Sequence, residues 1–365
     1  MESLSAALDT LYGANIDYTV RKKGERQCVG FAAGFIDDAF TPHGEKLLEP
    51  VAELLGELLL EPVTQRGRFL SEYVDSEKAN LIDAIRALRN DKRDWADIRL
   101  MQEMCAGEPY SVLRLGDEET ASRLNNQTLY THGQALLSGS RVELIYCGSA
   151  EEKRVEDAVL AALAALPRGA QTELPPVERV QAPAQPRLVT ETMDVTQGKL
   201  SLGFFTDITA NDPRYPALVL AATVFGGGAT SKLFTNVREQ MSLCYYASAS
   251  FEKFKGVLAV ASGVEFSKLE TAKKEILRQL EACCSGEISD YELESARGYL
   301  VSDLKIAMDS PGRLDDFYMG QILLESSATM QDLSDAIARV TKEEAAQAAR
   351  ALRLDTIYEL QGVQA

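Results

Sequence analysis

A proline-rich segment near the middle of the chain most strongly limits how these 365 residues can fold. Between Leu166 and Arg187 the sequence LPRGAQTELPPVERVQAPAQPR holds five prolines and almost no periodic pattern of apolar residues. Proline interrupts helices and sheet ladders, so this composition is typical of a tether between folded parts. It predicts an N-terminal domain at 1–167, a linker at 168–187 and a C-terminal domain at 188–365.

The composition indicates a globular protein that avoids polyanions. Hydrophobic residues make up 45% of the chain and charged residues 25%, which fits a packed core. The formal net charge of −17 repels nucleic acid and anionic membranes, so we expect neither as a partner. No apolar run is long enough to span a bilayer, and the first residues lack a secretory signal. The six scattered cysteines are expected to be thiols in a reducing cytoplasm.

Both halves of the chain combine strands with amphipathic helices. In the first half the pattern predicts a hairpin at Asn15–Phe35, helices at 47–59 and 74–104, and a buried strand at Val142–Cys147. In the second half it predicts a strand at 199–207, a hairpin over 245–264, and helices at 267–284 and 291–308. Each half has a hairpin followed by a helix and ends on a helix and a strand. We therefore predict an α+β fold with two homologous domains, each an antiparallel-rich sheet packed by helices, with chance similarity between the halves as the alternative.

The segment at 225–251, FGGGATSKLFTNVREQMSLCYYASASF, carries the most information about function. It resembles the C-terminal domain signature of the pitrilysin/insulinase-type (inverzincin) metallopeptidases, in the bacterial branch similar to the mitochondrial processing peptidase. The matching residues are Ser231, Leu233, Phe234, Arg238 and Tyr245. In that family the Arg and the Tyr hold the substrate carbonyl and stabilise the oxyanion. The resemblance implies the same roles for Arg238 and Tyr245, whereas a lone pair of these types would be a surface Arg and a strand Tyr.

The three glycines at 226–228, followed by Lys232, also suggest a phosphate-binding loop. That loop follows a strand and has a glycine directly before its lysine. Here the run follows a predicted helix, and serine precedes Lys232. We therefore expect no nucleotide site.

The resemblance extends to the first half of the chain through LDTLYGA at 8–14, the hairpin after it, and the stretch at 59–85 around the family's third zinc ligand. In active members a Glu begins that helix and the ligand Glu follows seven residues later. These two positions fall on Glu77 and Ala84. Asp83 is a poor substitute, because its side chain is shorter and points about 100° away around a helix. The resemblance therefore implies that the third metal ligand is lost.

The His-x-x-Glu-His motif, which binds zinc and activates water in this family, is absent from the chain. The two histidines, His43 and His132, have no partner one helical turn away and are expected at the surface. In the family the motif helix lies just before the segment matched by 8–14, and only seven residues precede Leu8. We therefore expect the N-terminal domain to lack its first elements.

These features lead to one expected function and two alternatives. We expect a catalytically inactive subunit that binds peptide and offers Arg238 and Tyr245 to the active site of a homologous zinc-bearing partner. It would form a heterodimer with that partner, or a homodimer, and would have no catalytic residue or cofactor of its own. One alternative is a peptide-binding or assembly protein without a peptidase partner. The other is an active zinc metalloendopeptidase whose motif lies upstream of Met1, against which Ala84 argues.

Overall fold

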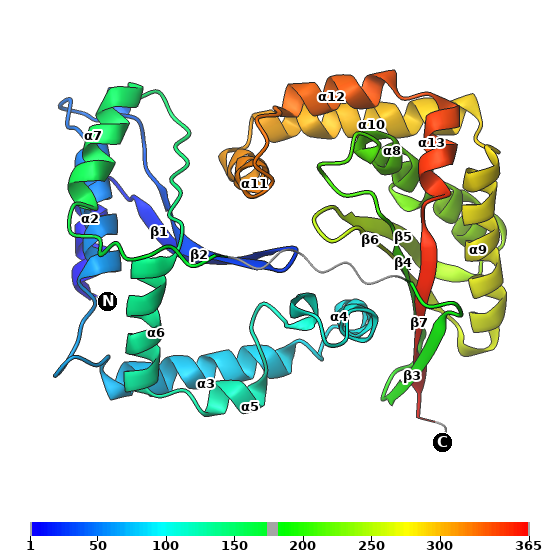
Figure 1. The fold of residues 1–365 in the computed structure, drawn as a ribbon, viewed down its shortest axis with the longest axis horizontal. Helices are drawn as coiled ribbons and strands as arrows, with labels where there is room; N and C mark the ends of the chain where they lie inside the picture. The colour runs from blue at the N-terminus through cyan, green and yellow to red at the C-terminus, as the bar shows by residue number, and fades with distance from the viewer. Residues whose placement is uncertain (1, 174–181, 364–365) are drawn as a thin grey trace. The chain divides into compact units, whose positions relative to one another are not determined.

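The computed structural model describes residues 2–173 and 182–363, which form two compact units (Figure 1). Unit 1 comprises Met1–Lys22, Arg26–Ile85 and Arg114–Pro176, and unit 2 comprises Lys23–Glu25, Arg86–Leu113 and Val177–Ala365. Both units combine helices and strands, which confirms the α+β class. The units interleave along the sequence, so the domain bounds at 167 and 188 stay a prediction. Of the linker predicted at 168–187, residues 174–181 lie outside the described residues.

Unit 1 has a small apolar core between two helices. Helices α2 (Leu48–Leu60) and α7 (Glu152–Ala162) meet through buried leucine, valine and alanine side chains. Gly56 allows this close approach, because a Cβ there would lie 2.5 Å from the carbonyl oxygen of Ala162. The other elements wholly or mainly in this unit are α1 (Glu2–Thr10), β1 (Asn15–Lys23), β2 (Arg26–Gly34), the 3₁₀ helix η1 (Asp38–Phe40), α3 (Ser71–Ala87), α5 (Glu118–Ser122) and α6 (Asn126–Gly139).

The two strand predictions for the first half had different outcomes. The hairpin predicted at Asn15–Phe35 is confirmed as β1 and β2, which form a two-stranded sheet. The strand predicted at Val142–Cys147 is wrong, and the side chains of Val142 and Leu144 are 42% and 52% exposed. An apolar segment forms a strand only where a neighbour accepts its hydrogen bonds. Within the described part of the chain, no strand pairs with this segment.

Unit 2 is built on a five-stranded sheet in the order β3-β7-β4-β6-β5. Its strands are β3 (Arg187–Met193), β4 (Gly198–Phe205), β5 (Cys244–Glu252), β6 (Val257–Val264) and β7 (Arg353–Gly362). All neighbours pair antiparallel except β3 and β7, which run parallel. The antiparallel-rich sheet predicted for the second half is therefore confirmed. Strand β5 lies at one edge of the sheet.

One face of this sheet carries the main core of unit 2. Four α-helices pack buried apolar side chains against the strands here: α8 (Tyr215–Gly226), α9 (Leu269–Ser285), α10 (Asp290–Met308) and α13 (Lys342–Ala349). Figure 1 shows these helices on the same side of the strands. The remaining helical elements of the unit are η2 (Pro109–Ser111), the π-helix η3 (Leu233–Gln240), η4 (Phe266–Lys268), α11 (Pro311–Leu323) and α12 (Met330–Arg339).

Helix α4 (Lys92–Met104) packs on the opposite face of the sheet, although it comes from the first half of the sequence. Asp91 caps this helix by accepting hydrogen bonds from the next turn, so the single helix predicted at 74–104 is two helices, α3 and α4. Leu100 and Met104 lie over Gly203 of β4, where a Cβ would be 2.4 Å from the Sδ atom of Met104. The glycine thus allows the helix to contact the sheet backbone.

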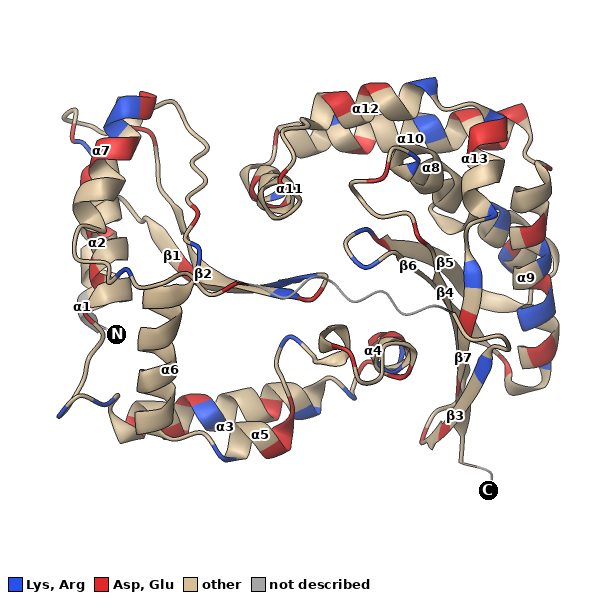
Figure 2. Cartoon of the chain, in the orientation of Figure 1, with Lys and Arg blue, Asp and Glu red and all other residues tan. Residues whose placement is uncertain are grey.

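Several helices carry charged side chains along their length. Figure 2 shows acidic and basic residues interspersed along α3 and α9. No helix of the described residues is both long and apolar enough to cross a membrane.

Two glycines of unit 2 provide a matched test of backbone strain. Gly256, between β5 and β6, has a φ of 76°, and a Cβ there would lie 2.6 Å from the carbonyl oxygen of Thr206. Gly286, after α9, has a φ of 83°, but the nearest atom to its Cβ position is 4.0 Å away. We expect Gly286→Ala to cost about 1–2 kcal/mol for the left-handed backbone, and Gly256→Ala to cost about 1–3 kcal/mol more for the clash. Denaturant unfolding measures both, and equal losses would contradict the steric argument.

Candidate substrate-binding site

Helix η3, which carries Arg238, is wound as a π-helix. The Ser231 hydroxyl accepts a hydrogen bond from the N–H of Phe234 at 3.3 Å at the start of the helix. Leu233 and Val237 are fully buried and hold one side of η3 against the core of unit 2. π-Helical turns are wider than α-helical turns, cost stability and occur often at functional sites. The sequence signature therefore coincides with an unusual backbone that turns Arg238 away from the core.

The guanidinium group of Arg238 lies partly exposed at this surface. Its side chain is 40% exposed, and its Nε lies 3.5 Å from a carboxylate oxygen of Glu239. The guanidinium carbon lies 4.5 Å from the centre of the Phe234 ring. Stacking on an aromatic face orients the planar group, and the exposed ion pair contributes little binding energy. Arg238 is thus oriented while remaining accessible to a ligand.

Tyr245 lies at a β-bulge at the start of strand β5. Cys244 pairs with Val264 and Tyr246 with Gly263, so Tyr245 has no opposite residue on β6. The preceding turn contains Ser242 in a left-handed conformation, with a φ of 48°. A bulge redirects one side chain relative to the regular alternation of the strand. Tyr245 is accordingly 65% exposed, although it belongs to a strand of the main sheet.

The positive charge of Arg238 acts on the beginning of β5. Burial raises the pKa of the Cys244 thiol, while a hydrogen bond with Ser262 and the charge of Arg238 oppose that rise. The N–H of Leu243 donates to the carbonyl oxygen of Val237 at 3.1 Å and ties the turn to η3. The structure therefore places the Arg and the Tyr of the sequence signature at one junction, between η3 and β5.

The arrangement combines an edge strand with hydrogen-bond donors. Strand β5 has a neighbour on one side only among the described residues, so its other edge can accept a further strand. A guanidinium and a phenol beside that edge are donors suited to a peptide carbonyl or to a developing oxyanion. These groups stabilise charge but supply no nucleophile.

The residues at the family's zinc position do not fit a metal ion. Glu77, Asp83 and Ala84 all lie on α3 in unit 1 and are exposed there. His43 and His132 are exposed as well, as predicted. Across residues 2–173 and 182–363, no three His, Cys, Asp or Glu side chains are grouped to hold a metal. A methyl group at Ala84 cannot replace a carboxylate ligand, so no catalytic step can be assigned to zinc on this chain.

We expect the purified chain to contain far less than one zinc ion per molecule. No three potential ligands are grouped among the described residues, and a site with fewer ligands is too weak to retain zinc through dialysis against a chelator. Elemental analysis by mass spectrometry measures the zinc content. A single tightly bound zinc ion per chain would contradict this expectation.

Two of the three glycines at 226–228 allow close packing, whereas Gly228 has no atom within 4 Å of its Cβ position. A Cβ at Gly226 would lie 2.7 Å from atoms of Ala249, and one at Gly227 would lie 2.6 Å from Thr223. Lys232 is 6% exposed, and its Nζ donates to a carboxylate oxygen of Glu292 at 2.9 Å. A lysine already buried in an ion pair is not available to a phosphate, which agrees with the expected absence of a nucleotide site.

Sequence reasoning missed a buried ion cluster at the turn between β5 and β6. The Nζ atom of Lys255 forms ion pairs with Glu25 and Glu108, and all three side chains are at most 8% exposed. Burial alone would lower the pKa of Lys255, but hydrogen bonds to the two carboxylates raise it. No sequence motif links three residues so far apart. Lys255, Glu25 and Glu108 all belong to unit 2, so the cluster ties three segments of that unit together.

The comparisons with known proteins fit this geometry. Residues 123–300 match a family model described as "Peptidase M16 inactive domain". The chain is 32% identical, over 99% of its own length and 84% of the relative, to the "Probable inactive metalloprotease YmfF" of Bacillus subtilis. A conserved protein from Enterococcus faecalis V583 has a similar structure, with a TM-score of 0.91 at 26% identity over 99% of this chain and 85% of that one. A peptidase M16 inactive domain from Pseudomonas fluorescens has the same fold, with a TM-score of 0.80 at 18% identity over 100% of this chain and 84% of that one.

Proposed function

The chain belongs to the M16 peptidase family as an inactive homologue of the pitrilysin/insulinase type, and from this premise we propose that it is the non-catalytic subunit of a peptidase pair. In this role it binds an extended peptide and contributes Arg238 and Tyr245 to the active site of a homologous zinc-bearing subunit. The partner supplies the metal, and this chain supplies hydrogen-bond donors.

The observation that carries the proposal is the junction between η3 and β5. Two costly backbone features, a π-helix and a β-bulge, occur within a dozen residues and leave Arg238 and Tyr245 accessible. Such features persist where function requires them, because a regular helix and strand would be more stable. Because the residues of this chain do not fit a metal ion, we infer that Arg238 and Tyr245 donate hydrogen bonds to a substrate that is cleaved at a zinc ion on another chain.

Peptide binding would use the open edge of β5. Backbone hydrogen bonds along that edge give affinity without selecting sequence, and side-chain contacts select between peptides. A carbonyl of the added strand near Tyr245 would then accept hydrogen bonds from the phenol and the guanidinium. The open edge and the two donors support an extended peptide as the substrate. The strand would hold the peptide in register, and the donors would polarise one of its carbonyl groups.

The complementation test uses the full chain and a zinc-bearing M16 homologue from the same genome. We expect the two proteins to purify as a complex, and the mixture to cleave a quenched fluorescent peptide far faster than either protein alone. The subunit role would be contradicted if the homologue alone were fully active, and if adding this chain gave neither a complex nor a gain in the cleavage rate. Complex formation without a gain in rate would instead favour an assembly protein.

We propose a cytoplasmic location. Six scattered cysteines at low density support a reducing compartment. The partner is therefore sought among cytoplasmic homologues.

A further inference from the structure

An arginine of α4 lies beside strand β5, on the face of the sheet against which α4 packs. Ala247 and Ala249 of β5 pack against the core that α8 covers. Since side chains alternate along a strand, Tyr246 and Ser248 point to the opposite face. Arg93, in the first turn of α4, reaches Ser248 there, and all of these residues belong to unit 2.

The guanidinium group of Arg93 is oriented but has no acidic partner. Its carbon atom lies 4.4 Å from the centre of the Tyr246 ring, and its Nη2 lies 3.4 Å from the Oγ of Ser248. The ring rests over Gly263 of β6, where a Cβ would lie 2.5 Å from it, and Lys199 of β4 approaches it on the same face. Among the residues that the structure describes, no carboxylate forms an ion pair with Arg93. Most of its five N–H donors are therefore available to a ligand.

Three aspartates lie near the start of α4, but two of them are already engaged. Asp91 caps the helix and accepts hydrogen bonds from the N–H groups of Arg93 and Asp94. Asp97 is half-buried and accepts a hydrogen bond from a serine of β4 at 3.0 Å. Asp94 is exposed and lies about 100° around the helix from Arg93. Arg93 is thus the charged group that contacts β5 directly.

A peptide strand added to β5 would bring one of its side chains within reach of this guanidinium. Residues that lie opposite each other across an antiparallel pair share a face of the sheet, with Cβ atoms about 4.5–5.5 Å apart. The peptide residue opposite Ser248 would therefore point toward α4, beside the Oγ atom that Arg93 contacts. A Glu side chain at this position is long enough to place its carboxylate against the Nη atoms of Arg93.

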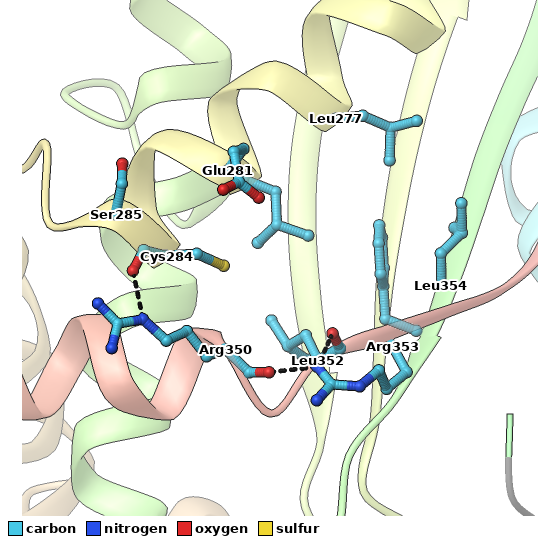
Figure 3. Close-up of a pocket in the computed structure, with 10 residues that line it drawn as sticks. Leu277, Glu281, Cys284, Ser285, Arg350, Leu352, Arg353 and Leu354 are labelled. Carbon is cyan, nitrogen blue, oxygen red and sulfur yellow. Dashed lines mark hydrogen bonds between the residues drawn. The ribbon is translucent and has the colours of Figure 1, made fainter.

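Two arginines at an open pocket of unit 2, between α9 and the segment that joins α13 to β7, lack such an arrangement (Figure 3). Arg350 donates to the carbonyl oxygen of Cys284 and Arg353 to that of Leu352. The strands that line this pocket, β4 and β7, both lie inside the sheet, so neither can accept a peptide strand. Arg93 differs because it lies beside a strand with an open edge.

We propose that the site prefers peptides with an acidic side chain opposite Ser248, and that Arg93 is the residue that selects it. The inference rests on the proposed binding of an extended peptide to β5 and adds a substrate class to it. The net charge of −17 repels acidic peptides as a whole, so a preference for an acid at one position has to come from a local contact. Arg93 acts on specificity and makes no contact with the carbonyl that is polarised.

Isothermal titration of the full chain with three blocked peptides tests this preference. The peptides are N-acetylated, C-amidated nonapeptides of threonine, serine and valine that carry Glu, Gln or Lys at the centre. We expect the Glu peptide to bind about fivefold more tightly than the Gln peptide, which is what one partly exposed pair of Arg and carboxylate provides. The Lys peptide should bind more weakly than both.

Charge reversal at Arg93 separates the local contact from the field of the whole chain. Arg93→Gln should abolish the advantage of the Glu peptide over the Gln peptide, and Arg93→Glu should make the Lys peptide the tightest. Lys92→Glu is the matched control, because it makes the same charge change at the adjacent position of α4, where the Lys92 Nζ donates to the carbonyl oxygen of Arg89. This control should leave the Glu peptide the tightest of the three.

The possible outcomes separate this inference from the proposed function. Tightest binding of the Lys peptide by the wild type, or equal binding of all three peptides, would overturn the role of Arg93 and leave peptide binding in place. A preference for the Glu peptide that survives Arg93→Gln would overturn that role as well. If none of the three peptides bound, the proposed peptide binding would fail, and the inference about Arg93 would fail with it.

Discussion

Arg238→Ala is expected to lower kcat of the complex with a zinc-bearing homologue by about 100- to 1000-fold. A preorganised donor to an oxyanion contributes about this factor, because it acts on charge that develops only in the transition state. Arg238 is surface-exposed and stacked on Phe234, so its loss leaves the core of unit 2 intact. The measurement is kcat at saturating peptide, with the complex verified by size-exclusion chromatography.

Two further variants sharpen this result. Arg238→Lys keeps the charge but loses the planar fork, so it should recover only part of the rate. Arg339→Ala removes an exposed Arg from α12 and should change nothing. An unchanged kcat for Arg238→Ala in a complex that is otherwise active would refute the role given to the η3–β5 junction.

Tyr245→Phe tests the second donor at the same junction. It removes only the hydroxyl group and keeps the ring, so the fold and the β-propensity stay the same. We expect kcat to fall while the free energy of unfolding is unaffected. Tyr291→Phe is the matched control, because Tyr291 is 71% exposed compared with 65% for Tyr245. Equal effects from the two variants would mean that Tyr245 has no special role.

Lys255→Met is expected to lower the free energy of unfolding by about 3–5 kcal/mol. Removing one partner of a buried ion cluster leaves uncompensated charge in the interior, here the carboxylates of Glu25 and Glu108. The folded-state pKa of Lys255 is raised, so its contribution is complete below its unfolded value of about 10.5 and is lost as the pH rises through the folded value. Urea unfolding at pH 7 therefore measures the full effect.

The carboxylates of Glu25 and Glu108 that remain in Lys255→Met are expected to cause most of the loss in the free energy of unfolding. Adding Glu25→Gln and Glu108→Gln to Lys255→Met removes the repulsion and should restore much of the stability. Lys153→Met, which breaks exposed pairs on α7, should cost about 1 kcal/mol or less. A Lys255→Met protein that unfolds at the same urea concentration as the wild type would show that the cluster contributes nothing.

Local signals in the sequence predicted most of the helices and strands. The capping box of Ser289 and Glu292 starts α10 near the predicted residue 291, and the turn at Gly24-Glu25 joins β1 to β2 within the predicted hairpin. Strand β3 was missed because it follows the proline-rich segment directly and pairs with β7 from the far end of the chain. The strand predicted at Val142–Cys147 is wrong for the opposite reason, since its pattern was strong but no strand of the described residues pairs with it.

The candidate site was predictable only in part. The family signature identified Arg238 and Tyr245, but no periodicity reveals that one residue is inserted opposite β6 or that η3 is wound as a π-helix. The Lys255 cluster left no trace in the sequence, because Lys255 and Glu25 are 230 positions apart. Such contacts depend on how distant segments pack, and a local pattern carries no information about them.

The position of β7 in the sheet has a consequence for synthesis. This strand, Arg353–Gly362, lies between β3 and β4, which are made more than 140 residues earlier. During synthesis, β3 and β4 must therefore keep exposed edges until residues 353–362 have left the ribosome. We expect a nascent chain stalled before residue 353 to be captured by chaperones or degraded, because the sheet cannot close without β7.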